Sequence, residues 1–420
     1  MNMSLFEPIL DATFREYADL EFRRHLLLLE GKEQEPGFDA IEDRMTGLWE
    51  TLNASQRQSL KGMGSDLNWI RRRALPPNGR KPEETTTAER QDLLRTRKEN
   101  DWHGFLHSLR ECAPIIPPSN LAYLRGTAYD AIEFPDFASS FYEHAADLEP
   151  ANASMGVIAM RAMEHIDPSK ALRRAKKIVA NSVRFPPAVV AFGTVIALRS
   201  EETEGHPIEK NRFTEILQDA IRRLQLEPPS DAGRAMTYQL AASGFEILDD
   251  LPSALQCYED GLKHSPDDEV LLIGKGLLLY GAQTARAIEA FGRVLRNEGS
   301  SLVWPYFFLA HHAMLLKNHD EALKLIKQAL TRATSKPVRA ELLEWQAICF
   351  SERGFPLEMV RAQFEKAMSQ DASNGRIRKN SEAFEEALIL GQETNWKIES
   401  ENTLRVDRSS SMRELHLVSA

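Results

Sequence analysis

The chain has 420 residues, of which 42% are hydrophobic and 27% are charged, and its formal net charge is -10 at pH 7. This length supports several domains or one long repeat array, and the negative charge argues against a general nucleic-acid-binding protein. Three widely separated cysteines match no metal-ligand spacing and suit a reducing compartment: Cys112, Cys257 and Cys349. No signal-peptide-like core and no apolar run of roughly 20 residues is present, so we expect a cytoplasmic protein without membrane spans.

Residues 1–75 are expected to form a helical N-terminal region. Apolar residues recur at helical spacing in two segments, and the glycine-containing stretch 31–37 separates these segments. Ser55 and Gln58 have the spacing of a capping box, which predicts the start of a third helix.

Residues 76–88 are rich in proline and threonine, and we expect them to be a linker. The densest basic cluster, Arg71–Lys81, overlaps this linker. Positive charge is favourable beside a helix C-terminus, so a solvated linker is one interpretation and an RNA or phosphate contact is the other. Thr86 and Glu89 then form a capping-box pattern that restarts the helical signal.

The clearest pattern lies in residues 119–152, where two apolar helical stripes are separated by Pro135 and closed by Pro150. Small residues occupy positions where two helices would cross closely, and Tyr142 fills the space beside them. The positions that carry this pattern are Gly126, Tyr129, Ala138, Tyr142, Ala145 and Pro150.

These six positions resemble the tetratricopeptide (TPR) signature of about 34 residues. The resemblance covers roughly residues 89–391 and is strongest at 119–152 and 235–268. It implies an all-α fold, a right-handed TPR-like α-α superhelical solenoid in which each helical hairpin covers the apolar face of its neighbour.

Weaker copies of the pattern flank this repeat, beginning with a degenerate one at 89–115. The copy at 187–229 contains a polar loop, Ser200–Lys210, which we interpret as an insertion between its two helices. A capping helix over about 376–391 ends the solenoid, and residues 392–420 are expected to be a disordered tail. The remaining copies are expected at 153–186, 235–268, 269–300, 303–336 and 337–374.

No motif in the sequence indicates chemistry. A phosphate-binding loop, a nucleophile elbow and an HExxH zinc motif are all missing, so we expect a non-enzyme with no catalytic, cofactor-binding or metal-binding residues. His311 and His312 lie near His319, which leaves a metal site as an alternative. No carboxylate follows them at ligand spacing on the same helix.

The TPR resemblance implies that the first helix of each repeat lines a groove that binds peptides or proteins. The alternative interpretation is that aromatic residues at these positions pack between helices. The candidate groove residues are Tyr123, Thr127, Gln239, Ser243, Phe307, His311 and Trp345.

We therefore predict a non-catalytic scaffold or adaptor that binds a peptide or protein partner in this groove. One alternative is a regulatory sensor that couples partner binding to the N-terminal region. The other is a nucleic-acid-binding protein that uses the Arg71–Lys81 cluster.

Overall fold

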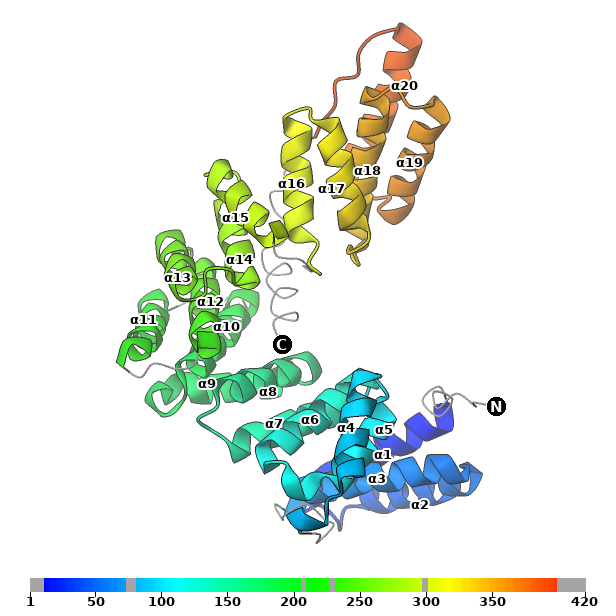
Figure 1. Cartoon of the computed structure of the whole chain (residues 1–420), viewed down its shortest axis with the longest axis vertical. Coiled ribbons are helices and arrows are strands. Elements are labelled where there is room, and N and C mark those ends of the chain that lie inside the picture. The colour runs from blue at the N-terminus through cyan, green and yellow to red at the C-terminus, as the bar shows by residue number, and fades with distance from the viewer. Residues whose placement is uncertain (1–10, 73–80, 205–208, 227–230, 297–300, 399–420) are drawn as a thin grey trace. The chain divides into compact units, whose positions relative to one another are not determined.

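The structure is a computed structural model that describes residues 11–72, 81–204, 209–226, 231–296 and 301–398 (Figure 1). Every regular element in these ranges is helical, which confirms the predicted all-α class. The chain divides into two compact units, Met1–Ile208 and Glu209–Ala420. None of the described helices is long and apolar enough to cross a membrane.

The first unit contains ten α-helices and three short 3₁₀ helices among its described residues. The α-helices are α1 Ala12–Glu30, α2 Pro36–Thr51, α3 Ala54–Arg72, α4 Thr87–Lys98, α5 Trp102–Glu111, α6 Pro118–Ala131, α7 Pro135–Leu148, α8 Ala153–Ile166, α9 Pro168–Ala180 and α10 Pro187–Glu204. The 3₁₀ helices are η2 Pro82–Glu84, η3 Ala113–Ile115 and η4 Ser182–Arg184.

The described part of the second unit also contains ten α-helices. They are α11 Lys210–Leu226, α12 Asp231–Ile247, α13 Leu251–His264, α14 Glu269–Leu279, α15 Thr284–Arg296, α16 Trp304–Leu315, α17 His319–Leu330, α18 Lys336–Glu352, α19 Leu357–Gln370 and α20 Gly375–Leu390.

Side-chain caps fix where several helices begin. Thr86 accepts a hydrogen bond from the Glu89 backbone N–H, and the Glu89 carboxylate accepts one from the Thr86 backbone N–H, so the predicted capping box is confirmed. At α3 the capping residues differ from the prediction. Asn53 and Gln56, rather than Ser55 and Gln58, exchange side-chain-to-backbone hydrogen bonds of 2.9 Å, because the helix begins at Ala54, two residues earlier than predicted.

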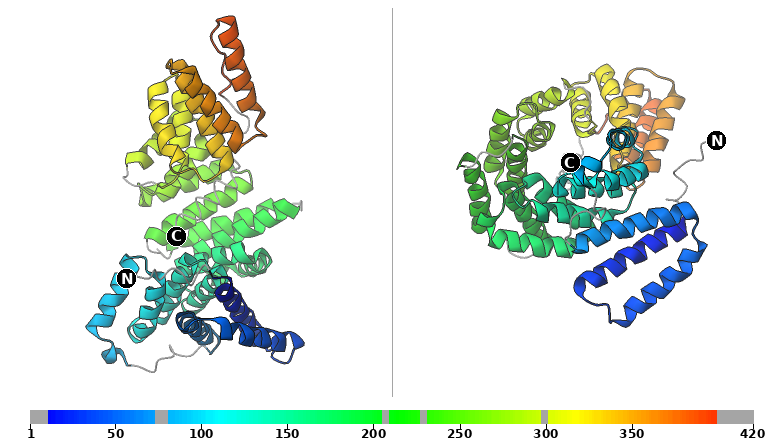
Figure 2. Two further views of the ribbon diagram at one scale, coloured as in Figure 1. Left: turned by 90° about the vertical axis from the view of Figure 1, so that its right-hand side faces the viewer. Right: turned by 60° about the horizontal axis from the view of Figure 1, so that its bottom comes forward.

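The three N-terminal helices pack beside one another, with α1 in contact with both α2 and α3 (Figure 2, right). Phe14 of α1 and Leu67 of α3 are buried in the same apolar core as Tyr129 and Phe141 of the α6–α7 hairpin. The N-terminal helices therefore share one core with the first repeats. The basic cluster Arg71–Lys81 lies largely outside the described residues.

A buried ionic cluster joins α3 to the first repeats. Asp66 of α3 is fully buried and accepts hydrogen bonds from the Arg110 Nε and Nη2 atoms of α5, at 3.1 and 2.7 Å. Arg125 of α6 places Nη2 3.2 Å from the same carboxylate, and the Tyr129 hydroxyl donates to it over 2.7 Å. The Arg125 guanidinium also lies over the Trp69 ring, 4.8 Å from its centroid.

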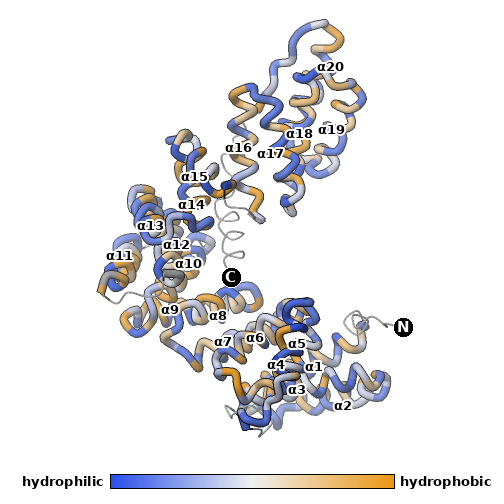
Figure 3. Tube along the Cα trace, viewed as in Figure 1, coloured by the Kyte–Doolittle hydropathy of each residue, from blue (hydrophilic) through white to orange (hydrophobic). Residues whose placement is uncertain are grey.

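Successive helices pack against each other along the chain. The extensive pairs include α6 with α7, α7 with α8, α12 with α13, α14 with α15, α16 with α17 and α18 with α19. Apolar and polar positions alternate along these helices (Figure 3), as expected when one face of each helix is buried. The predicted hairpins at 119–152 and 235–268 thus correspond to α6–α7 and α12–α13.

Glycines allow the closest helix crossings. A Cβ atom on Gly126 of α6 would lie 2.7 Å from the Tyr142 ring of α7, closer than a real contact permits. In the second unit a Cβ on Gly274 would meet the Tyr258 ring, and one on Gly276 would meet Phe291 at 2.5 Å. The same glycine-against-aromatic contact therefore recurs along the chain.

We expect the Gly126→Ala substitution to lower the free energy of unfolding by about 1–3 kcal/mol, because the added methyl group overpacks against Tyr142. The matched control is Gly47→Ala in α2, where a Cβ would have nothing within 4 Å. The control should raise stability by up to about 1 kcal/mol through higher helix propensity. Urea unfolding of both variants checks the prediction, and equal effects would contradict it.

The polar loop predicted at Ser200–Lys210 is wrong for its first residues, because α10 continues to Glu204. The Ser200 hydroxyl donates a 2.9 Å hydrogen bond to the Glu204 carboxylate, and Thr203 donates one of 2.7 Å to the Arg199 carbonyl. Contacts between residues four apart satisfy these polar groups within a helix, so the polar composition alone did not predict a loop correctly.

Candidate functional site

Three of the predicted groove residues lie together in the second unit. Phe307 and His311 are four residues apart on α16, and both face Trp345 of α18, with ring centroids 4.7 and 5.2 Å from the indole. All three side chains are buried in the described structure. They therefore form the support beneath a surface and do not stand free on it.

The other candidates lie on different hairpins. Gln239 and Ser243 are buried on α12, where the Ser243 hydroxyl donates a 3.1 Å hydrogen bond to the Gln239 carbonyl. Tyr123 and Thr127 are half-buried on α6 in the first unit. The Tyr123 ring lies 5.8 Å from Tyr142, so it also contributes to packing within its hairpin.

Side chains on one face of α20 contact Glu344, the residue before Trp345 on α18. Arg376, Asn380 and Phe384 are spaced four residues apart on α20, so they share one helix face. The side chain of Asn374 caps the start of α20 by accepting from the backbone N–H groups of residues 376 and 377. We call the surface formed by α16, α18 and α20 the first-helix face, since α16 and α18 are the first helices of their hairpins.

Glu344 is the central charge of the first-helix face and is fully buried. Its Oε2 lies 2.7 Å from Arg376 Nη2, and its Oε1 accepts a 2.7 Å hydrogen bond from Asn380 Nδ2. Arg376 Nη2 also lies 3.4 Å from Glu341. These contacts fix the Asn380 amide and the Arg376 guanidinium on α20 in defined orientations.

Burial changes the protonation of two groups here. It raises the pKa of Glu344 to about 7, although Arg376 and the Asn380 hydrogen bond act in the opposite direction. Burial lowers the pKa of His311 to about 4, with the positive charge of Arg376 adding to the effect and an interaction with the Ile398 backbone opposing it. His311 is therefore neutral at pH 7, and its Nδ1 lies 2.7 Å from the Tyr280 hydroxyl.

We expect His311 to make the second unit less stable as the pH falls from 6.5 to 4. In this window the unfolded chain binds a proton on His311 and the folded chain does not, so protonation favours unfolding. The difference between 6.5 and about 4 corresponds to about 3 kcal/mol. Glu344 contributes the opposite slope between pH 4.5 and about 7, because its proton is bound more tightly in the folded chain.

The two slopes are separated by comparing variants. The free energy of unfolding of His311→Gln should fall less than that of the unmodified chain between pH 6.5 and 4. Gln328→Ala, which removes an exposed and non-titrating side chain on α17, serves as the control and should keep the original profile. Identical pH profiles for the His311 variant and the unmodified chain would contradict the prediction.

The chain turns back across the first-helix face after α20. Gly391 ends the helix in the left-handed conformation with φ of 63°, which favours glycine, and the chain continues as an extended segment (Figure 1). We call residues 392–398 the strap. The Trp396 ring lies 6.2 Å from both Phe364 of α19 and Phe384 of α20, and its Nε1 donates to the Glu352 carboxylate over 2.6 Å.

The strap backbone is held by two side chains of α20. The Lys397 N–H donates to Asn380 Oδ1 and the Lys397 carbonyl accepts from Asn380 Nδ2, both at 2.9 Å. Arg376 Nη1 donates to the Ile398 carbonyl over 2.8 Å. Asn380 thus bridges Glu344 below and a stretch of extended backbone above.

The strap differs from the predicted tail, which began at residue 392. Residues 392–398 are described and packed, and the rest of that tail, residues 399–420, lies outside the described residues. The residues that define this site were missed by the sequence analysis: Glu344, Arg376, Asn380 and Trp396. A lone tryptophan after the last helix was the one signal that could have indicated a packed segment.

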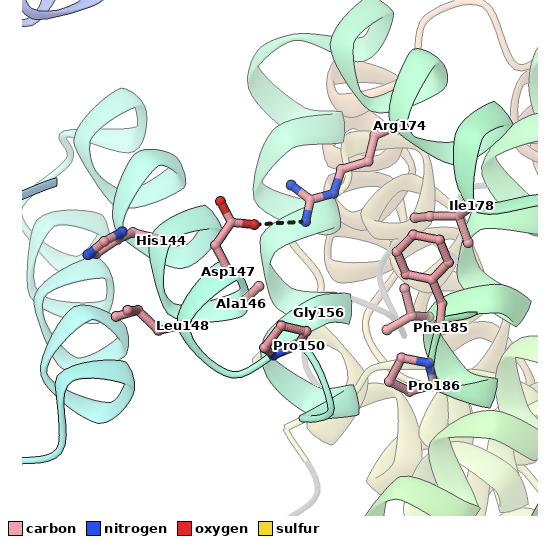
Figure 4. A pocket seen from close by; sticks show the side chains of 11 residues that line it. His144, Ala146, Asp147, Leu148, Pro150, Gly156, Arg174, Ile178, Phe185 and Pro186 are labelled. Carbon is pink, nitrogen blue, oxygen red and sulfur yellow. Dashed lines mark ion pairs between the residues drawn. The ribbon is translucent and has the colours of Figure 1, made fainter. Parts of the chain in front are cut away.

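A hollow lies in the first unit and has a volume of about 470 Å³ (Figure 4). The Asp147 carboxylate at its edge lies 3.7 Å from Arg174 Nη2. Its lining is otherwise mainly apolar and includes Gly156, Ile178, Phe185, Pro186 and Val189. It could hold an apolar side chain, and the residues around it provide no nucleophile paired with a base.

The histidine alternative gains no support from the geometry. His311 faces Tyr280 and Trp345, and the described part of the chain contains no group of three or more His, Cys, Asp or Glu side chains arranged to hold a metal ion.

Comparison of the sequence with protein-family models and with curated proteins gives no match. Among solved structures, the C-terminal part of a TPR repeat-containing protein from Cytophaga hutchinsonii is 13% identical, covering 69% of this chain and 98% of that chain, with a TM-score of 0.33. Human IFIT1, as a dimer with PPP-AAAA, is 13% identical over 97% of this chain and 94% of that chain, with a TM-score of 0.42.

The TPR2AB domain of yeast Sti1, in a complex with pHSP90, is 15% identical over 59% of this chain and 98% of that chain, with a TM-score of 0.22. The helices of this chain pair in succession and cross where glycine meets an aromatic ring. These hairpins give the chain the TPR-like fold that the sequence resemblance implies.

Proposed function

We propose that this chain is a non-catalytic interaction protein that binds an extended segment of a partner protein on its first-helix face. The observation that supports the proposal is the seating of the strap, in which Asn380 holds the N–H and the carbonyl of one extended residue. The asparagine amide pairs with a backbone N–H and a backbone carbonyl. Every residue other than proline has both groups, so this contact does not depend on the side chain of the bound residue.

The first-helix face also has the composition of a binding surface. Buried aromatic side chains, Phe307 and Trp345, give it a rigid base, and Arg376 offers a donor for a peptide carbonyl. Arginine is one of the residue types that commonly provide the main energy of protein interfaces. Tyr123, Thr127, Gln239 and Ser243 remain proposed contributors on other hairpins.

A library of random linear peptides, selected on the intact chain, tests this proposal. Hydrogen exchange of the chain with each selected peptide should slow in α16, α18 and α20. The Asn380→Ala variant should lose this protection, while Gln328→Ala, which removes an exposed amide on α17, should keep it. Failure to select any peptide, or protection confined to α17, would contradict the proposal.

A second candidate is a regulatory sensor in which partner binding to the repeats alters the N-terminal helices. The Asp66 cluster favours it, because this carboxylate of α3 contacts Arg110 of α5 and Arg125 of α6 directly. A selected peptide that changes the rate of protease cleavage within residues 12–72 would support coupling. Unchanged cleavage at saturating peptide would count against it.

A further inference from the structure

We propose that the first-helix face is specific for an extended peptide in which tryptophan is followed, two residues later, by an aliphatic residue. We also propose that the strap is the built-in occupant of this face, which a partner peptide must displace. Both statements rest on the proposed function. They add the sequence pattern of the bound peptide, which the proposed function does not specify.

The strap has the conformation of an extended chain. Along residues 394–398 the side chains alternate between half-buried and exposed, with Thr394, Trp396 and Ile398 toward the protein and Asn395 and Lys397 toward solvent. This period of two is that of an extended chain. In such a chain the N–H and carbonyl of one residue point to the same side, which matches the paired contacts of Asn380 with Lys397.

Three side chains surround Trp396, and we call them the tryptophan seat: Glu352, Phe364 and Phe384. Phe364 and Phe384 lie nearly parallel to the Trp396 ring, at interplanar angles of 25° and 21°, and Glu352 accepts the indole N–H. A phenylalanine or leucine at this position would leave the Glu352 carboxylate without that donor. The two parallel phenylalanine rings therefore favour a large aromatic ring, and the exposed Glu352 carboxylate accepts the N–H group of an indole.

The third step concerns the two residues after the tryptophan. The Ile398 side chain packs against the apolar core of the second unit, and its carbonyl accepts from Arg376. The Lys397 side chain is exposed, so this residue, which lies between Trp396 and Ile398, contacts the protein only through its backbone. The recognised pattern is thus tryptophan, any residue other than proline, and then an aliphatic residue.

The same geometry explains why the strap competes with a partner. The strap joins α20 through a single turn at Gly391, so its local concentration at the face is high, on the order of millimolar for a short tether. A partner peptide with identical contacts must displace this tethered copy, which weakens its apparent affinity.

A labelled synthetic peptide of residues 391–400, GQETNWKIES, tests the proposal in trans. We expect it to bind a variant that ends at Gly391, and to bind the full chain about tenfold or more weakly. The Trp396→Ala peptide should not bind, and the Lys397→Ala peptide should bind like the original. Equal binding to the full chain and the shortened variant would overturn the proposal, as would no binding to a shortened variant whose helical content and unfolding are intact.

Two full-length variants keep the test valid if the shortened chain does not fold. Trp396→Ala should loosen the strap and increase the affinity of the full chain for the labelled peptide, whereas Lys397→Ala should leave it unchanged. An affinity unaltered by Trp396→Ala would overturn the proposal. A dimer that depends on Trp396 in light scattering would assign the strap to the face of a second copy, which would overturn its role as an occupant in cis.

The outcome also separates this inference from the proposed function. Library-selected peptides that protect the first-helix face but lack the tryptophan pattern would refute the inference and leave the proposed function standing. Selection of no peptide, together with no binding of the labelled peptide, would refute both.

Discussion

Replacing Asp66 with alanine is expected to lower the free energy of unfolding of the first unit by about 3–5 kcal/mol. The substitution removes the carboxylate from a cluster in which it contacts Arg110 and Arg125, and the Arg125 side chain is fully buried. Two guanidinium groups would then lie in or beside the core without their counter-charge. Such an uncompensated buried charge destabilises a fold far more than loss of a surface pair does.

The ionisation of Asp66 supports this expectation. Burial acts to raise the pKa of this carboxyl group, but Arg125, Arg110 and the Tyr129 hydroxyl outweigh it and hold the pKa below its usual value. Asp66 is therefore charged at pH 7. Its substitution removes two ion pairs and the acceptor of three hydrogen bonds.

Urea unfolding followed by tryptophan fluorescence measures the effect, since Trp69 lies directly beneath Arg125. The matched control is Glu133→Gln, which breaks the exposed ion pair with Arg15. That pair is surface-exposed, so the control should change stability by about 1 kcal/mol at most. An Asp66→Ala effect as small as that of the control would contradict this account of the cluster.

The Trp345→Ala substitution is expected to lower the free energy of unfolding of the second unit by about 3–5 kcal/mol. Trp345 is 0% exposed, and its ring contacts Phe307 and His311 across the α16–α18 crossing. Truncation would leave a cavity at the base of the first-helix face. The loss combines the transfer free energy of the indole with the cavity that neighbouring helices do not fill.

Ile389→Ala provides the control for this prediction, because Ile389 is 83% exposed on α20. Its removal should change stability by no more than about 0.5 kcal/mol, as for surface positions in general. Guanidinium unfolding of the two variants and the unmodified chain makes the comparison. Similar effects of the two substitutions would show that Trp345 does not support the fold as its burial indicates.

The architecture was predictable because local patterns encode it. Gly126, Ala138 and Tyr142 occupy the positions at which the two helices of a TPR-like hairpin cross. The structure places the Tyr142 ring against Gly126, as the sequence implied. Helix boundaries were less predictable. Ser55 and Asn53 offer competing caps two residues apart, and Gln56 of the observed cap also donates a hydrogen bond to Asp11, which is 45 residues away.

The site was not predictable, because its contacts join distant positions. Asn380 meets Glu344, which is 36 residues away, and Trp396 meets Glu352, which is 44 residues away. No local periodicity relates such pairs. The sequence predicts helices that carry Phe307 and Trp345, but the burial of both side chains depends on neighbouring helices that are distant in the sequence.

The most direct test of the central claim is the hydrogen-exchange rate of the Lys397 backbone amide in the intact chain. If Asn380 holds the extended strap, this amide should exchange more slowly than in the free peptide of residues 391–400. The Asn380→Ala variant should restore the fast rate, while Gln328→Ala should not change it. A Lys397 amide that exchanges at the free-peptide rate in the intact chain would contradict the claim that the first-helix face binds an extended backbone.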